Sequence, residues 1–68
     1  MAIIYVANID YRSTEANVRS AFEVYGHVEK VSLRPGFAFV EMKDNAEAQN
    51  AISDMNRNSS WVLRETAA

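Results

Sequence analysis

Cysteine is absent from this chain of 68 residues, and histidine occurs only once, at position 27. The missing thiols exclude disulfides and thiolate metal sites, and a lone His27 removes most zinc arrangements. A chain this short forms one domain at most, and such a domain buries only about 60% of the surface of its unfolded chain. Its stability must therefore come from an apolar core, for which a hydrophobic content of 49% is sufficient.

Groups that carry catalysis are equally scarce. The two glycines form no phosphate-binding loop, and no metal ligands cluster along the sequence. The chain is also too short to enclose a sizeable pocket. We therefore expect a binding protein that has no catalytic activity, no cofactor and no metal ion.

Long hydrophobic runs and positive charge are lacking as well. The longest apolar runs span only a few residues, too short to cross a membrane, and the first residues do not resemble a secretory signal. We expect an intracellular protein, either cytoplasmic or nuclear, that contacts no membrane. The net charge of −2 gives no general attraction to nucleic acids, so the distribution of charge matters more than its sum.

Stretches rich in β-branched and aromatic residues predict four strands. They span residues 3–7, 28–33, 37–42 and 61–64. The connection Arg34-Pro35-Gly36 predicts a tight turn between the second and third strands, because proline presets its dihedral angle and glycine permits a positive one. In the last strand we expect Trp61 and Leu63 to point inward together.

Apolar residues spaced by three and four predict two helices, at about 15–25 and from residue 44 to about residue 55. Thr14 and Asp44 are expected to cap their N-termini, and Gly26 is expected to cap the C-terminus of the first. Residues 56–60 are expected to form a polar loop, and the tail from Thr66 to Ala68 is expected to fray.

The resulting order, strand-helix-strand-strand-helix-strand, predicts an α+β protein with the ferredoxin-like arrangement. Four antiparallel strands form one sheet, and both helices cover one of its faces. Right-handed crossovers place the first and third strands at the centre. We expect a single domain over residues 1–68, ordered from about residue 3 to residue 65, whose second sheet face is open to solvent.

Aromatic side chains are predicted on this open face, where polar residues are the usual choice. Strand alternation places Tyr5, Phe37 and Phe39 there, while the opposite face already has enough apolar residues to fill the core. These core residues are Ile4, Val6, Ala38, Val40 and Met42. A register slipped by one residue would bury the three aromatics instead and expose the aliphatic set. Exposed aromatic patches of this kind indicate a binding surface.

Two segments of the chain resemble a known family. Residues 36–40, Gly-Phe-Ala-Phe-Val, are similar to the core of the longer signature strand of the RNA recognition motif. Residues 4–9, Ile-Tyr-Val-Ala-Asn-Ile, resemble its shorter signature on the first strand, and both helices are also similar to those of the family. The resemblance covers about residues 3–65 and is closest to a compact variant, like small single-domain RNA-binding proteins of bacterial type.

The resemblance implies a set of RNA-binding residues. Tyr5 and either Phe37 or Phe39 stack on bases or pack against sugars, and Asn8 shapes the end of the first strand. We expect Lys30 and Arg64 on the open face, with Arg34 and Arg12 in loops at its edge. The predicted RNA-binding residues are thus Tyr5, Asn8, Lys30, Arg34, Phe37, Phe39 and Arg64.

One departure from the family pattern and one acidic residue weaken the expected grip on phosphates. Pro35 replaces the basic residue that opens the longer signature, and Glu41 follows Phe39 on the open face, where it repels a nearby phosphate. We therefore expect stacking to dominate, with weak to moderate affinity, micromolar to millimolar, for a few nucleotides.

Single-stranded RNA is the expected partner, and single-stranded DNA is a further candidate. The acidic balance and the short loops leave an alternative open, a protein-interaction or homodimerisation module that uses the same sheet face. A small hydrolase of the acylphosphatase type also shares the fold, but the chain carries no catalytic group for it.

Overall fold

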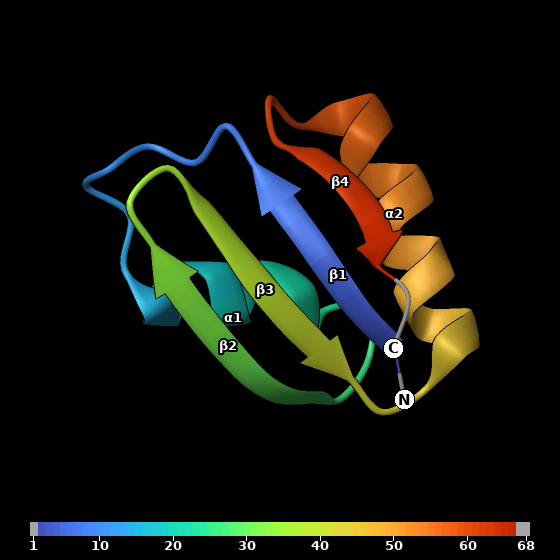
Figure 1. Ribbon diagram of the computed structural model, residues 1–68. Coiled ribbons are helices and arrows are strands. Elements are labelled where there is room, and N and C mark those ends of the chain that lie inside the picture. Colours follow the sequence, from blue (N-terminus) through green and yellow to red (C-terminus); the bar gives the residue numbers. More distant parts are fainter. Residues whose placement is uncertain (1, 67–68) are drawn as a thin grey trace.

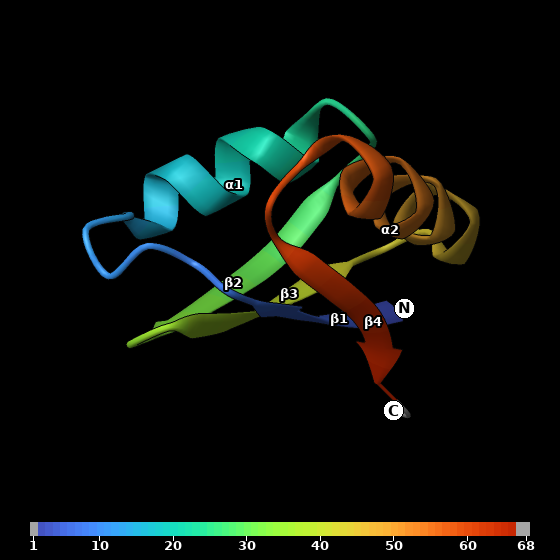
Figure 2. The ribbon, with the colours of Figure 1, turned by 90° about the horizontal axis from the view of Figure 1, so that it is seen from above.

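Four strands and two helices make up the computed structural model, which describes residues 2–66 (Figure 1). In chain order they are β1 (Ala2–Ala7), α1 (Glu15–Glu23), β2 (Val28–Arg34), β3 (Phe37–Met42), α2 (Asn45–Asn58) and β4 (Val62–Thr66). The strands form one antiparallel sheet in the order β2-β3-β1-β4. Both helices lie on the same side of this sheet (Figure 2). The predicted ferredoxin-like fold, with β1 and β3 at the centre, is confirmed. No helix within residues 2–66 is long and apolar enough to span a membrane.

The core lies between the sheet and the two helices. Alternation along β1 and β3 turns their aliphatic residues toward the helices, and Val18 and Phe22 of α1 meet them from the other layer. The buried members from the central strands and α2 are Ala2, Ile4, Val6, Ala38, Val40, Met42, Ala48, Ala51 and Met55. Among the described residues no polar or charged side chain is buried, so the contact between the sheet and the helices rests on hydrophobic packing.

An irregularity in β2 adjusts which of its residues reach this core. The pairing with β3 shifts from Val28 opposite Met42 to Lys30 opposite Glu41, which leaves Glu29 as an extra residue. A bulge of this kind reorients the residues around it. As a result Val28 and Val31 are both buried despite their odd spacing, while Lys30 and Ser32 face the open side.

Helix α1 begins as predicted but ends two residues earlier than predicted. Thr14 caps it in a capping box, in which the Thr14 hydroxyl accepts from the Asn17 N–H and the Asn17 side chain accepts from the Thr14 N–H. The C-cap is Val24, so the expected role of Gly26 as a C-cap is wrong. A β-carbon at Gly26 would collide with the side chain of Glu47, and glycine there allows α2 to approach.

Helix α2 is longer, and the loop after it shorter, than the pattern indicated. The helix continues to Asn58, so most of the predicted loop at 56–60 is helical. Asn56 contributes to this end, because its side-chain amide donates to the Leu63 carbonyl (2.9 Å) and its oxygen accepts from the Leu63 N–H (2.8 Å). This pair of bonds fastens the last turns of α2 to β4.

Strand β4 also differs from the prediction, because it begins at Val62 and ends at Thr66. The hydroxyl of Thr66 donates to the carbonyl of Ile3 at 3.1 Å, so the expected fraying is wrong for this residue, and Ala67 and Ala68 lie outside the described residues. Trp61 packs inward as predicted, with its ring stacked on Phe22 at 6.4 Å between centroids.

Replacing Asn56 with alanine tests the link between α2 and β4. We expect Asn56→Ala to lower the free energy of unfolding by about 1–3 kcal/mol, because the polar groups of Leu63 lose both partners. The control Asn50→Ala makes the same change at an exposed position of α2, where alanine favours the helix by about 0.5 kcal/mol. Urea unfolding measures both variants. Equal stabilities would contradict the role given to Asn56.

Candidate nucleic-acid interface

Three aromatic rings meet at the centre of the open sheet face. Tyr5 on β1 lies opposite Phe39 on β3, and Ala7 lies opposite Phe37, so strand alternation turns all three rings to the same side. Their centroids are 5.5 Å (Tyr5 to Phe39), 5.9 Å (Tyr5 to Phe37) and 5.8 Å (Phe37 to Phe39) apart. We call Tyr5, Phe37 and Phe39 the aromatic cluster. The predicted register is confirmed, because the aliphatic residues between these rings are the buried ones.

The rings of the aromatic cluster are tilted against one another. The planes of Phe37 and Phe39 meet at 87°, while Tyr5 is inclined by 39° to Phe37 and by 51° to Phe39. Edge-to-face contacts of this kind stabilise the cluster itself and leave ring faces pointing in different directions. Phe39 has the most accessible ring, with 37% of the residue exposed. Its partner on the neighbouring strand β2 is Ser32, whose small side chain leaves the ring uncovered on that side. Each ring can therefore offer its own face to an unpaired base.

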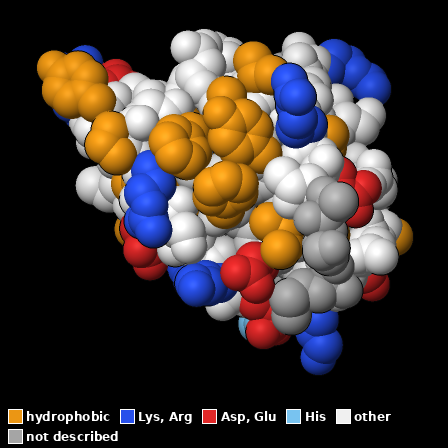
Figure 3. All heavy atoms as spheres, viewed as in Figure 1, with side chains coloured by type: hydrophobic (Ala, Val, Ile, Leu, Met, Phe, Trp, Pro, Cys, Tyr) orange, Lys and Arg blue, Asp and Glu red, His pale blue; other side chains and the backbone are white. Residues whose placement is uncertain are grey.

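Basic side chains border the hydrophobic centre of this face on several sides, and acidic side chains lie below it in the view of Figure 3. In the strand register Lys30 on β2 lies opposite Glu41 on β3, and Arg64 on β4 lies opposite Tyr5 on β1. Lys30 and Arg64 are therefore exposed on the open face, as predicted. Arg34 is the last residue of β2, opposite Phe37, and its predicted place in a loop is wrong. Its guanidinium donates to the carbonyl of Leu33 at 3.2 Å.

The acidic side chains are divided between the two layers. Glu41 lies half-buried on the open face between Ile3 and Lys30 on the neighbouring strands, as its place after Phe39 predicts. The carboxylates of the helices belong to the opposite layer (Glu15, Glu23, Glu47 and Asp54). The open face is therefore less acidic than the net charge of the chain suggests.

Asn8 ends β1 in a conformation that few residues adopt. Its φ of 64° lies in the left-handed region, which asparagine tolerates better than most residues. Its side-chain amide donates to the carbonyl of Ser60 at 2.9 Å and so joins the end of β1 to the connection between α2 and β4. The structure thus gives Asn8 a clear role in shaping the strand end.

Titratable groups with specific partners lie away from the aromatic cluster. His27 and Glu29, at the edge of the sheet, form a contact of 3.0 Å between Nε2 and Oε1. On the helical layer the Tyr25 hydroxyl donates to Asp54, and this hydrogen bond raises the pKa of Tyr25 above its usual value of 10.0. No three histidine or acidic side chains gather as metal ligands anywhere in residues 2–66.

One exposed aromatic was missed by the sequence argument. Tyr11, in the loop between β1 and α1, is 84% exposed, and the Arg12 guanidinium lies 5.9 Å from the centre of its ring. The signal was present, because Tyr11 stands in a polar stretch outside every apolar stripe. It did not enter the argument because a loop residue has no strand partner that assigns it to a face.

Comparison with known proteins agrees with this geometry. A sequence profile of the RNA recognition motif matches residues 4–60. The chain belongs to the RNA recognition motif family. RbpD of the cyanobacterium Nostoc sp. (strain PCC 7120), a proposed RNA-binding protein, is 39% identical over 70 residues, which cover 91% of this chain and 73% of RbpD.

Other relatives of this RNA recognition motif are longer proteins or solved domains. The serine/arginine-rich splicing factor RS41 of Arabidopsis thaliana is 37% identical over 84% of this chain, which spans only 16% of its length. The crystal structure of the RNA-binding protein PG1 is 28% identical and superposes with a TM-score of 0.88, covering 100% of this chain and 96% of that one.

The backbone of Asn8 can be tested apart from its hydrogen bond. Asn8→Ala loses the bond to Ser60 and forces alanine into the left-handed region, so we expect its free energy of unfolding to fall by about 1–2 kcal/mol. Asn8→Gly loses the same bond but adopts this φ freely. We expect the glycine variant to be the more stable of the two in urea unfolding. If alanine proves as stable as glycine, the strain assigned to position 8 is absent.

Proposed function

We propose that this domain binds single-stranded RNA by stacking unpaired bases on Tyr5, Phe37 and Phe39. The observation that carries the proposal is the aromatic cluster, which lies on the open face of the two central strands although the core does not need it. Membership of the RNA recognition motif family and a relative named for RNA binding support the same ligand.

The energetics favour a modest affinity. Each stack of a base on an aromatic ring contributes about 1–3 kcal/mol, so two or three stacks give roughly 3–9 kcal/mol before costs. Ordering the RNA and the side chains removes several kcal/mol of this. The remainder corresponds to dissociation constants between micromolar and millimolar. Single-stranded DNA presents the same ring faces and is the natural competitor.

Phosphate contacts add little to this binding. The exposed Arg34 and Arg64 lie opposite Phe37 and Tyr5 of the aromatic cluster, and the exposed Lys30 lies opposite Glu41, two residues along β3 from Phe39. If these side chains neutralise three phosphates of a single strand, a plot of the logarithm of the association constant against the logarithm of the salt concentration has a slope of about −2. We therefore propose a domain that recognises bases by stacking and depends only weakly on salt.

The variant Phe39→Ala tests the stacking surface. We expect it to weaken the binding of short RNA by about 1–3 kcal/mol, because the most exposed ring of the cluster is lost. Phe39→Tyr keeps a flat ring and serves as the matched control, with affinity close to that of the wild type. Amide chemical shifts during titration with a pool of short RNAs measure both variants.

The same titration can contradict the proposal. Absence of shifts at residues 4–8 and 36–41 at millimolar RNA would show that the face does not bind RNA. Sedimentation of the free domain would then show whether a second copy covers the aromatic cluster, as expected of a homodimerisation module. A monomer without RNA-dependent shifts would leave binding of another protein as the remaining use of this face.

Neutralising Glu41 tests the electrostatic part of the proposal. We expect Glu41→Gln to bind RNA about twofold to fivefold more tightly, since an exposed charge a few ångströms from a phosphate contributes up to about 1 kcal/mol in water. Glu23→Gln changes the net charge equally on α1 and should leave the affinity nearly unchanged. Equal effects of both substitutions, measured at two salt concentrations, would mean that only the net charge matters.

A further inference from the structure

A tight turn holds Tyr11 outside the core. The Ser13 N–H donates to the Asp10 carbonyl at 2.9 Å, and the Asp10 carboxylate accepts from the Arg12 N–H at 2.9 Å. The Arg12 guanidinium also lies 3.4 Å from this carboxylate. The turn is thus braced by its own polar groups, and it presents a large ring that contributes nothing to the core.

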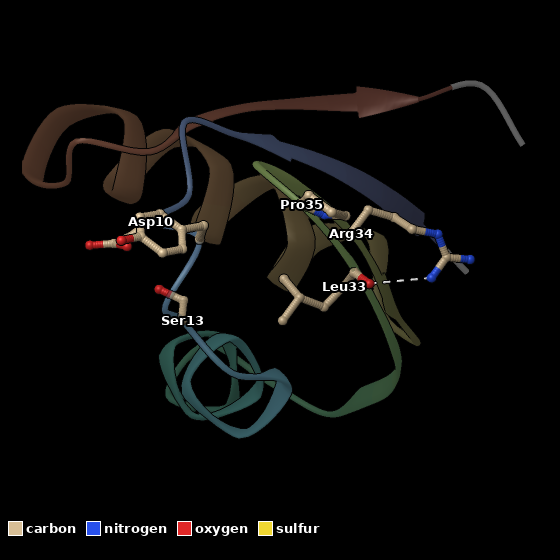
Figure 4. A pocket seen from close by; sticks show the side chains of 6 residues that line it. Asp10, Ser13, Leu33, Arg34 and Pro35 are labelled. Atoms are coloured by element: carbon tan, nitrogen blue, oxygen red, sulfur yellow. Dashed lines mark hydrogen bonds between the residues drawn. The ribbon is translucent and has the colours of Figure 1, made fainter.

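This turn forms one wall of a hollow at the edge of the sheet. The hollow measures about 450 Å³ and is lined by Asp10, Tyr11, Ser13, Leu33, Arg34 and Pro35. Asp10 and Ser13 come from the connection between β1 and α1, whereas Leu33 and Pro35 come from the end of β2 and the turn after it (Figure 4). The Ile9 N–H donates to the Gly36 carbonyl at 3.3 Å and fastens the two walls together. A size of roughly 300–1,000 Å³ is typical of sites for small molecules.

The chemistry of the hollow suits a flat, mostly apolar group with polar edges and a nearby negative charge. The Tyr11 ring, Leu33 and Pro35 supply apolar surface, while Asp10 and Ser13 supply groups that bond to the edge of a base. The guanidinium of Arg12 lies beside the Tyr11 ring, and that of Arg34 lies at the rim, reaching away from Asp10 and Ser13 (Figure 4). The Arg34 guanidinium can accompany a phosphate, whereas that of Arg12 already lies 3.4 Å from the Asp10 carboxylate. A nucleobase attached to its phosphate has this combination of features.

The hollow and the aromatic cluster lie on the two sides of the β2–β3 hairpin. Leu33 lies opposite the buried Ala38 and so lines the hollow from the core side of the sheet, whereas Arg34 lies opposite Phe37 on the open face. The view of the open face shows hydrophobic side chains both at its centre and at the corner where the β1–α1 connection meets the β2–β3 turn (Figure 3). An RNA strand that lies on the cluster can therefore reach the hollow by passing the β2–β3 turn at Pro35.

We propose that the hollow beside Tyr11 is a further base-binding site, which takes one more nucleotide of the RNA that occupies the aromatic cluster. This inference rests on the proposed function, because the cluster holds the rest of the strand. The site extends the recognised RNA beyond the open face and compensates for the basic residue that the family pattern has at position 35.

The test compares RNA pools of two lengths on the wild-type domain and three variants. One pool has three nucleotides, and the others carry two more at the 5′ or the 3′ end. We expect a longer pool to bind more tightly to the wild type, and Tyr11→Ala to weaken that pool by about fivefold to hundredfold while the short pool is unaffected. Tyr11→Phe keeps the ring and should bind as the wild type does. Val24→Ala is the surface control, because it removes apolar surface from a residue that is 78% exposed at the end of α1. It should leave the affinity for every RNA pool unchanged.

Amide chemical shifts distinguish failure of the second site from failure of the proposed function. RNA-dependent shifts at residues 4–8 and 36–41, with equal affinities of wild type and Tyr11→Ala for all pools, overturn the second site and leave the proposed function intact. Loss of both pools' affinity in Tyr11→Ala would also overturn it, since the ring would then act on the whole surface. If no pool shifts residues 4–8 and 36–41, the proposed function and the second site fail together.

Discussion

Burial of the aliphatic face of β1 and β3 against the two helices is the constraint on which the rest of the molecule depends. The chain has no cysteine, and no charged side chain is buried within residues 2–66, so this apolar layer is what holds so small a domain together. Because Ile4, Val6 and Val40 already fill the space under the sheet, alternation leaves Tyr5, Phe37 and Phe39 on the other side. The proposed binding surface is therefore a consequence of the core, and its rings lie on the two central strands of the sheet.

Side-chain hydrogen bonds stabilise the ends of the helices and strands. Thr14 with Asn17 caps α1, while Asn56 with Leu63 and Asn8 with Ser60 join an element to a neighbouring segment through side-chain amides. Such bonds contribute only about 1 kcal/mol each, yet they help to fix where the strands and helices begin and end.

In the proposed mode of binding, electrostatic attraction to phosphates contributes less than it does in strongly basic RNA-binding proteins. The acidic side chains of α1 and α2 belong to the layer behind the sheet, and Lys30, Arg34 and Arg64 flank the rings in front. Proline at position 35 and Glu41 on the open face limit the pull on phosphates. The proposed mode of recognition is accordingly one in which stacking supplies most of the free energy and the cations mainly orient the strand.

By itself, the sequence determined the order of elements, the antiparallel sheet, and the face on which Tyr5, Phe37 and Phe39 lie. These features follow from periodicity, which is a local property, and from the right-handed crossover rule. The RNA-binding roles of these residues stay a proposal.

Only the tertiary structure decided the length of α2, the extent of β4, the need for glycine at position 26 and the hollow beside Tyr11. Each of these depends on a partner distant in the chain: Leu63 for Asn56, Ile3 for Thr66, Glu47 for Gly26, and the β2–β3 turn for Tyr11. Such contacts leave no period in the sequence, because they arise only when the packed sheet and helices bring the partners together.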